Sequence, residues 1–108
     1  MYPEVKKLDP LIKTCHHRLE QLKFCFENRN KFGDELKFEL QNVLTNLANK
    51  INKIDTSQLY HDEKNKLDNV FNLSMSLYQD LTEKPKIEYS AIQVAYQLSS
   101  ILESLKNK

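Results

Sequence analysis

Apolar residues recur at helical spacing in four stretches of the chain, most clearly between Ile87 and Leu105. In this stretch the apolar positions follow alternating steps of four and three residues: Ile87, Ala91, Val94, Leu98, Ile101 and Leu105. Such spacing aligns side chains along one side of an α-helix. Ile92 falls off this row, at about 140° from Ile87 if each residue turns roughly 100°. We expect a helix over 87–106 whose apolar row the rest of the chain must cover.

Two amphipathic stretches lie in the N-terminal half. Asp9 followed by Pro10 is typical of a helix start, because aspartate caps free N–H groups and proline fits the first turn. The apolar row that follows is Ile12, Cys15, Leu19, Leu22 and Phe26. We predict a helix over 10–29; the alternative is a start at Pro3 with a bend at Pro10. After a break at Gly33, a second helix over 34–53 is predicted by the row Leu36, Leu40, Val43, Leu47, Ile51 and Ile54.

A third helix is predicted over 57–83. Asp55 with Gln58 three positions on approximates a capping box at its start. The first turns are polar, and a buried face follows at Leu67, Val70, Phe71, Ser74, Leu77, Tyr78 and Leu81. Pro85 ends the helix, because proline disfavours helical geometry at the residue before it.

The four predicted helices form a single domain covering residues 1–108. One glycine and three prolines in 108 residues argue against turn-rich β structure. The chain is long enough to bury a core without disulfide or metal staples. Because short links favour antiparallel neighbours, we predict an all-α, antiparallel up-down-up-down four-helix bundle.

Charge, hydropathy and cysteine positions indicate which partners, cellular location and disulfide bonds to expect. Sixteen Lys and Arg against fifteen Asp and Glu leave a formal charge of +1, which disfavours binding to nucleic acid or anionic lipid. The chain has no apolar run of signal-peptide or membrane-spanning length, so we expect a cytoplasmic protein without membrane association. Cys15 and Cys25 lie about 15 Å apart on one predicted helix, which is too far for a disulfide between them.

Candidate metal ligands gather at Cys15, His16 and His17. Thiolate and imidazole are good zinc ligands, but adjacent helical residues point about 100° apart, so the triplet needs distant helpers such as His61. Zinc sites typically show Cys and His pairs at short fixed spacing, and a di-iron bundle needs two Glu-x-x-His pairs. The chain has neither pattern. We therefore expect Cys15 to pack in the core, and we predict no metal site, no cofactor and no catalytic residue.

Tyrosines recur in the C-terminal half, at Tyr60, Tyr78, Tyr89 and Tyr96. Half-buried tyrosines close the seams of helical bundles, and tyrosines are also enriched where proteins contact partners. On the last helix, the positions off the apolar row are the ones expected to face outward. These positions form the predicted partner surface: Tyr89, Ile92, Gln93, Tyr96 and Gln97.

Phe24 and Phe38 lie off the main apolar rows of the first two helices. They either form a dimer face or cover the turn around Phe32 and Gly33, and we favour the second interpretation. The chain is accordingly expected to be a monomer or a homodimer.

A family resemblance lies in the last two predicted helices. The run from Gln93 to Leu98 continues through Ile101, Leu102 and Leu105, and it follows a segment containing Asn69, Leu73, Met75 and Tyr78. The run resembles the last helix of the YppE-like family of small bacterial helical-bundle proteins, and the earlier segment is similar to that family. The resemblance covers residues 58–106. It implies a four-helix bundle of uncharacterised function, with no catalytic residues.

No motif of the chain specifies a reaction, whereas every regular pattern serves helix packing. We therefore predict a non-catalytic protein-interaction module with an unidentified protein partner. One alternative is a small-ligand or metal-binding bundle with a pocket lined by Cys15, His16 or His61. The other is a nucleic-acid-associated protein, which the near-neutral charge disfavours.

Overall fold

Four α-helices make up the fold of the computed structural model, which describes residues 6–28, 34–55, 57, 59–83 and 88–106. The helices are α2 (Asp9–Glu27), α3 (Asp34–Asn52), α4 (His61–Glu83) and α5 (Tyr89–Lys106), and the described residues contain no strand. The predicted all-α class is therefore confirmed. None of these helices combines the length and apolar character needed to cross a lipid bilayer, as far as the described residues go.

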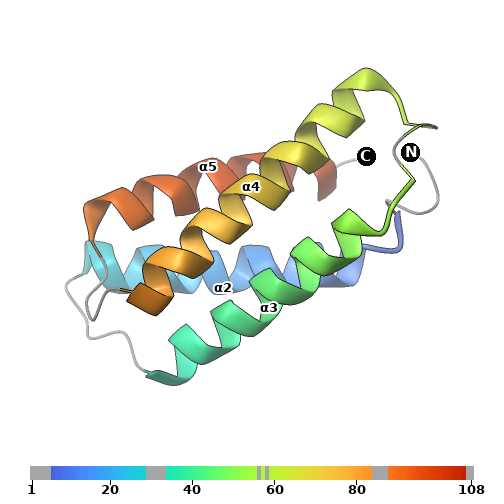
Figure 1. The fold of residues 1–108 in the computed structure, drawn as a ribbon. Helices are drawn as coiled ribbons and strands as arrows, with labels where there is room; N and C mark the ends of the chain where they lie inside the picture. Colours follow the sequence, from blue (N-terminus) through green and yellow to red (C-terminus); the bar gives the residue numbers. More distant parts are fainter. Residues whose placement is uncertain (1–5, 29–33, 56, 58, 84–87, 107–108) are drawn as a thin grey trace.

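The helices form an elongated bundle of 43 × 24 × 21 Å. Each helix packs against the next one in sequence, and α5 returns to pack against α2, which closes the ring. Along the seam between α2 and α5, Lys23 contacts Tyr96 and Phe26 contacts Tyr89, so contacts run in opposite order on the two helices. The ribbon reverses direction from each helix to the next (Figure 1). This is the predicted up-down-up-down arrangement.

The start of α2 agrees only in part with the prediction. Pro10 lies in the first turn, where a missing N–H costs nothing. Asp9 is the first residue of the helix, and the cap position is Leu8 without a side-chain hydrogen bond, so the predicted capping by Asp9 is wrong. At the other end Asn28 closes the helix, since its backbone N–H and its side-chain Nδ2 both donate to the Phe24 carbonyl at 3.0 and 2.9 Å. The helix ends at Glu27, close to the predicted residue 29. Residues 1–5 and 29–33 lie outside the described part of the chain, and with them the alternative start at Pro3 and the predicted break at Gly33.

The start of α4 differs from the prediction by four residues. Asp55 does not begin the helix; its Oδ1 accepts hydrogen bonds from the backbone N–H and the hydroxyl of Ser57, at 3.1 and 2.7 Å. These bonds lower the pKa of Asp55 below its ordinary value. A carboxylate bonded two residues ahead closes a turn that competes with a helical cap. The helix begins at His61, and the first-turn bond runs from the N–H of Lys64 to the carbonyl of Tyr60.

The core is one continuous cluster to which all four helices contribute. Its fully buried large side chains are Ile12, Leu19, Leu22, Leu40, Leu44, Leu47, Leu67, Leu77, Leu81, Ile92, Leu98 and Leu102. The predicted rows of α2, α3 and α4 supply most of these residues, but Phe26, the last residue of the predicted α2 row, is exposed, so its predicted burial is wrong. Cys15 is also fully buried, which confirms its predicted packing role.

α5 is rotated about its own axis relative to the row inferred from the sequence. Ile92 is only 1% exposed, whereas Val94 and Ile101 are half-buried. The reason is that α5 packs against both α2 and α4, so its buried arc must reach two neighbours. Ile92 lies one turn before Tyr96, which contacts α2. The expectation that Ile92 faces outward is therefore wrong.

Candidate functional site

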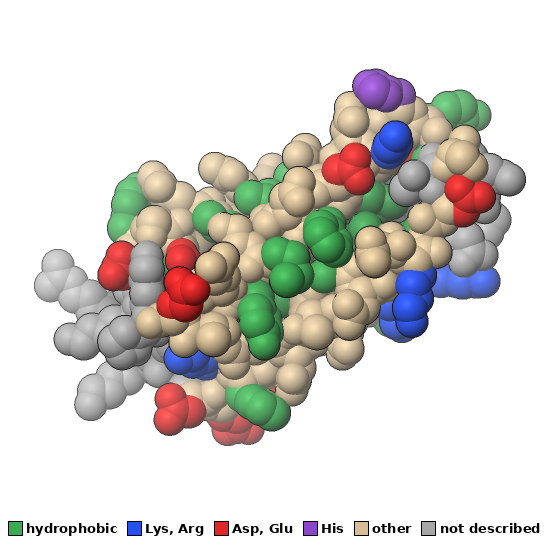
Figure 2. Space-filling view, viewed as in Figure 1, with side chains coloured by type: hydrophobic (Ala, Val, Ile, Leu, Met, Phe, Trp, Pro, Cys, Tyr) green, Lys and Arg blue, Asp and Glu red, His purple; other side chains and the backbone are tan. Residues whose placement is uncertain are grey.

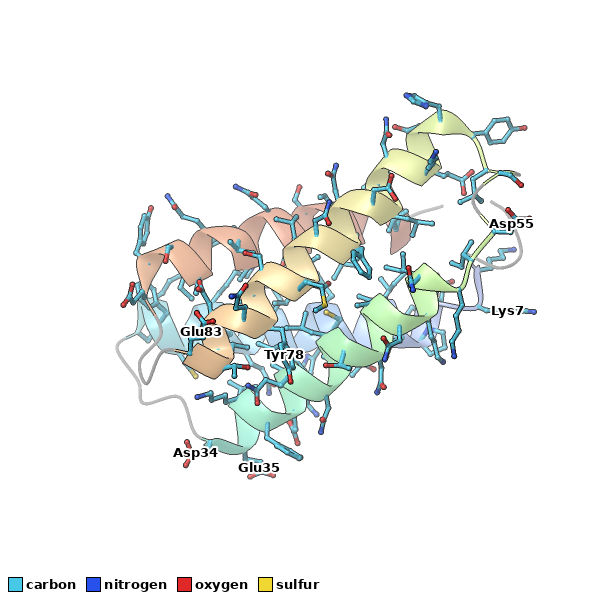
Figure 3. All side chains as sticks on the ribbon, viewed as in Figure 1. Lys7, Asp34, Glu35, Asp55, Tyr78 and Glu83 are labelled. Atoms are coloured by element: carbon cyan, nitrogen blue, oxygen red, sulfur yellow. The ribbon has the colours of Figure 1, made fainter. Side chains whose placement is uncertain are left out.

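Charged residues are unevenly distributed over the four helices. α2 carries them along its whole length, but residues 40–49 of α3, 69–79 of α4 and 89–102 of α5 contain no Asp, Glu, Lys, Arg or His. The middle of the surface over α4 accordingly shows only hydrophobic and uncharged polar side chains, with charges toward the two ends (Figure 2). Glu83, Asp34 and Glu35 lie at one end, and Lys7 and Asp55 at the other (Figure 3). We call the accessible part of these three segments, apart from Tyr89 and Tyr96, which contact α2, the charge-free face.

The outward side chains of α4 form a ridge that borders two shallow hollows. The first has a volume of about 490 Å³ and is lined by α4 residues alone, with Glu83 at its end beyond the charge-free segment; the others are Asn72, Met75, Ser76, Tyr78, Gln79 and Thr82. The groove between α4 and α5 has a volume of about 460 Å³, and its lining consists of Asn69, Asn72, Leu73, Gln97, Ser100 and Ile101. Asn72 lines both hollows and is exposed on the α4 ridge.

Apolar and amide side chains alternate on the charge-free face. Met75 is 45% exposed, and Leu73 and Ile101 are half-buried in the α4–α5 groove. Tyr78 lies between α4 and α3, against the core (Figure 3). The exposed amides of the face are Asn42, Asn46, Asn49, Asn69, Asn72, Gln79, Gln93 and Gln97. Contact surfaces between proteins are likewise depleted of charge at their centre and enriched in tyrosine and methionine.

The structure divides the predicted partner surface of α5 into three parts. Gln93 and Gln97 are exposed, and Gln97 lines the α4–α5 groove. Tyr89 and Tyr96 are also exposed, but they lie on the α2 side, where Tyr89 packs 6.4 Å from the ring of Phe26. Ile92 is buried in the core and cannot belong to an accessible surface.

A second, larger hollow of about 820 Å³ lies along α2. Most of its lining comes from α2, and the rest comes from Glu35, Leu36 and Glu39 of α3 and Tyr96 of α5. The eight α2 residues are His17, Arg18, Glu20, Gln21, Lys23, Phe24, Cys25 and Glu27.

Ion pairs occupy much of this α2 groove. Arg18 contacts Glu39 across the α2–α3 seam at 3.2 Å, and Lys23 contacts Glu20 at 2.6 Å. Lys23 is only 8% exposed, and its ammonium lies 4.5 Å from the centre of the Tyr96 ring. A buried ammonium needs such partners, because desolvation penalises an unpaired charge. The groove thus combines apolar and charged side chains, and Arg18 and Lys23 already form ion pairs with Glu39 and Glu20.

The candidate metal ligands do not converge. Cys15 is sealed in the core, where burial raises the pKa of its thiol to about 12. His16 Nε2 lies 3.5 Å from Glu20 and 3.4 Å from Glu103, forming a link between α2 and α5. His17 lines the α2 groove, and His61 is exposed at the start of α4. Among the described residues, no group of three His, Cys, Asp or Glu side chains could hold a metal ion.

Phe24 and Phe38 are both largely exposed, on α2 and α3 respectively. Phe32 and Gly33, which they were expected to cover, lie outside the described residues. Three buried polar atoms have no hydrogen-bond partner in the described part of the chain: Glu63 Oε2, Ser74 Oγ and Ser99 Oγ. Glu63 occupies the core-facing row of α4, four residues before Leu67.

The charge-free face was missed by reasoning on one helix at a time. Its signal is present in the sequence as three separate runs without a charged residue or histidine. Each run is unremarkable in itself, since it belongs to an amphipathic helix with amide and hydroxyl residues outside. Only the order of the helices around the bundle shows that the runs are adjacent.

Comparison of the chain with protein-family models, with curated proteins and with solved structures finds no match. The resemblance to the YppE-like family therefore stays a prediction. The candidate site rests on the chain's own residues and their arrangement.

Proposed function

We propose that this protein is a non-catalytic protein-interaction module and that the charge-free face is its contact surface. The observation that supports this proposal is the absence of charge across three neighbouring helices of a chain in which 29% of residues are charged. A solvated surface without a partner has no need to avoid charge, since lysine and glutamate are good helix formers and aid solubility. Their absence from the middle of three helices favours a surface that becomes buried.

The physical basis is the cost of desolvation. Burying a charged group in an interface is costly unless a partner charge matches it. Amide and hydroxyl groups cost less, because they exchange hydrogen bonds with water for hydrogen bonds with a partner. The exposed Met75 and the apolar floor of the α4–α5 groove add apolar area. The helical backbone is already ordered, so the entropy lost on binding comes mainly from exposed side chains such as Met75 and Gln97.

A capture experiment with charge variants tests the proposal. Purified, tagged protein is used to retain binding partners from a lysate of the source cells, alongside Asn72→Glu, which places a carboxylate at the centre of the face. We expect the wild type to retain at least one specific protein and N72E to lose it. Glutamate is a better helix former than asparagine, so N72E should remain folded.

The matched control is Thr14→Glu, which introduces the same charge at an exposed position of α2. T14E should retain the same protein as the wild type. The proposal is contradicted if the wild type specifically retains no protein and also shows no self-association, or if N72E retains the partner as well as T14E does.

A second candidate function is small-ligand binding in the α2 groove, and the observation that favours it is the groove's volume of about 820 Å³. Clefts of this size accommodate small organic ligands. Leu36 and Phe24 would contact apolar parts, while Arg18 and Glu39 would orient polar groups. A thermal-shift screen of small metabolites, repeated with Leu36→Glu, tests this candidate. It is contradicted if no compound stabilises the wild type, or if L36E is stabilised equally.

A further inference from the structure

We infer that the partner of the charge-free face is a second copy of the same chain, bound as a two-fold dimer with α4 against α4. This inference rests on the proposed function, because it uses the same contact surface and names its occupant. Three features support it. The polar groups of the face can pair with the same groups of a second copy, the shape of the face fits a second copy, and the opposite side of the bundle is charged.

The chemistry of the face is self-complementary. In a two-fold dimer each residue near the axis lies close to its own copy. A carboxylate or an ammonium in that place would face an identical charge and be repelled. An amide carries both donors and an acceptor, so Asn72 can form hydrogen bonds with the partner's Asn72. Asn69 and Gln97, which share the α4–α5 groove with it, have the same property.

The relief of the face also fits a second copy. The α4 ridge borders a groove of about 460 Å³ that α4 forms with α5, and helices pack when the ridge of one enters the groove of the other. In a face-to-face pair, the ridge of each copy can enter the α4–α5 groove of its partner. Met75, 45% exposed on the ridge, would then contact apolar side chains such as Leu73 and Ile101.

The charged side of the bundle limits assembly to a pair. α2 carries Lys13, Arg18, Glu20 and other charged residues along its length, and it lies diagonally across the ring from α4. When the two charge-free faces meet, the α2 sides remain in water. Because both copies use the same face, the interface is isologous, and a dimer has no free copy of this face to bind a third chain.

The size of the face predicts a weak dimer. The three segments span roughly 15–21 Å at about 1.5 Å per residue, and the bundle is 24 Å across. The face therefore covers on the order of 400–500 Å² per copy, so a dimer buries less than the ~1,200 Å² at which stable interfaces begin. We expect dissociation constants between roughly 10 μM and 1 mM, in the range of transient complexes.

Sedimentation equilibrium tests this inference. The wild type is measured between about 10 μM and 1 mM, a range that brackets the expected dissociation constant, at low and at high NaCl concentration. We expect a monomer–dimer equilibrium that salt does not weaken, because no charge pair contributes to it. Asn72→Lys and Asn72→Glu should each weaken dimerisation at least about tenfold, since like charges then meet at the axis.

Mixing supplies the decisive readout. Because N72K and N72E carry opposite charges at the same place, an equimolar mixture of the two should dimerise again, whereas a merely unfolded or distorted variant would not be rescued. The controls Thr14→Lys and Thr14→Glu on α2 should dimerise like the wild type. A monomer throughout the concentration range overturns the inference, as does a dimer insensitive to charge at residue 72 or dissolved by salt.

The outcome separates this inference from the proposed function. If the protein stays monomeric while N72E still loses a heterologous partner, the second copy is the wrong occupant and the contact surface stands. If N72E changes neither dimerisation nor capture, the contact surface itself is wrong.

Discussion

Replacing Ile92 with alanine should destabilise the bundle far more than the same replacement of Ile101. The two residues lie on one helix and lose the same atoms, but Ile92 is 1% exposed and Ile101 is half-buried. Removing a fully buried isoleucine side chain to alanine costs about 2–5 kcal/mol, through lost transfer energy and the cavity left behind. At a half-buried position the loss is smaller, about 1 kcal/mol, because less area leaves water and solvent fills part of the gap.

The measurement is urea unfolding followed by circular dichroism at the helical band. The midpoint should fall for both variants, with the free energy of unfolding lowered by about 2–5 kcal/mol in I92A and by about 1 kcal/mol in I101A. The apolar row of the sequence predicts the opposite order, since Ile101 lies on the row and Ile92 lies off it. A larger loss in I101A than in I92A would show that α5 is not rotated as described.

Three further predictions concern cysteine, glutamate and pH. In the native protein a thiol reagent should modify Cys25, which lines the α2 groove, while Cys15 reacts only after unfolding; equal rates would contradict its burial. Burial raises the pKa of Cys15 to about 12, so the contribution of this thiol to the free energy of unfolding is intact below the ordinary thiol pKa and falls as the pH rises from there toward 12. Cys15→Ala should therefore unfold at a higher alkaline pH than the wild type, and an unchanged midpoint of alkaline unfolding would refute this. Glu63→Gln should raise the midpoint of thermal unfolding at neutral pH, because it replaces a carboxyl side chain that is only 6% exposed and whose Oε2 has no hydrogen-bond partner. A lowered midpoint would contradict this reasoning.

Much of the fold follows from hydrophobic periodicity, as the rows of α2 and α3 illustrate. Leu40, Leu47 and Ile51 recur at spacings that only a helix can align, and they are buried. Helix boundaries were predictable to within two residues where chemistry is simple, as at Asn28. They were less predictable before α4, where the Asp55 carboxylate bonds locally to Ser57 in preference to capping a helix.

The rotation of α5 could not be predicted from the apolar row of that helix alone. A periodic row locates the apolar side of a helix, but the buried arc depends on how many neighbours the helix meets. α5 meets two, so Ile92 is buried on one flank while Val94 is only half-buried on the other. A helix placed between two neighbours buries a wider arc than its most regular row suggests.

The candidate site was only partly accessible from the sequence. Gln93 and Gln97 were placed correctly on the exposed side of α5, whereas the tyrosines beside them face α2 and the residues of α4 were not included. The charge-free runs were visible in the sequence, but their adjacency depends on the order of the helices. Whether the histidines come together also depends on the fold. His17 and His61 lie on α2 and α4, which are not neighbours in the ring, so they do not converge.

The most direct test of the contact surface is a concentration series of two-dimensional NMR spectra of the isotope-labelled protein. Raising the concentration from about 20 μM to about 1 mM should shift or broaden the side-chain amide signals of Asn69, Asn72 and Gln97, because dimerisation buries them. Backbone signals of Lys13 and Thr14 on α2 should remain in place. Shifts confined to α2, or spectra that do not change with concentration, would contradict the assignment of the charge-free face as the surface where two copies meet.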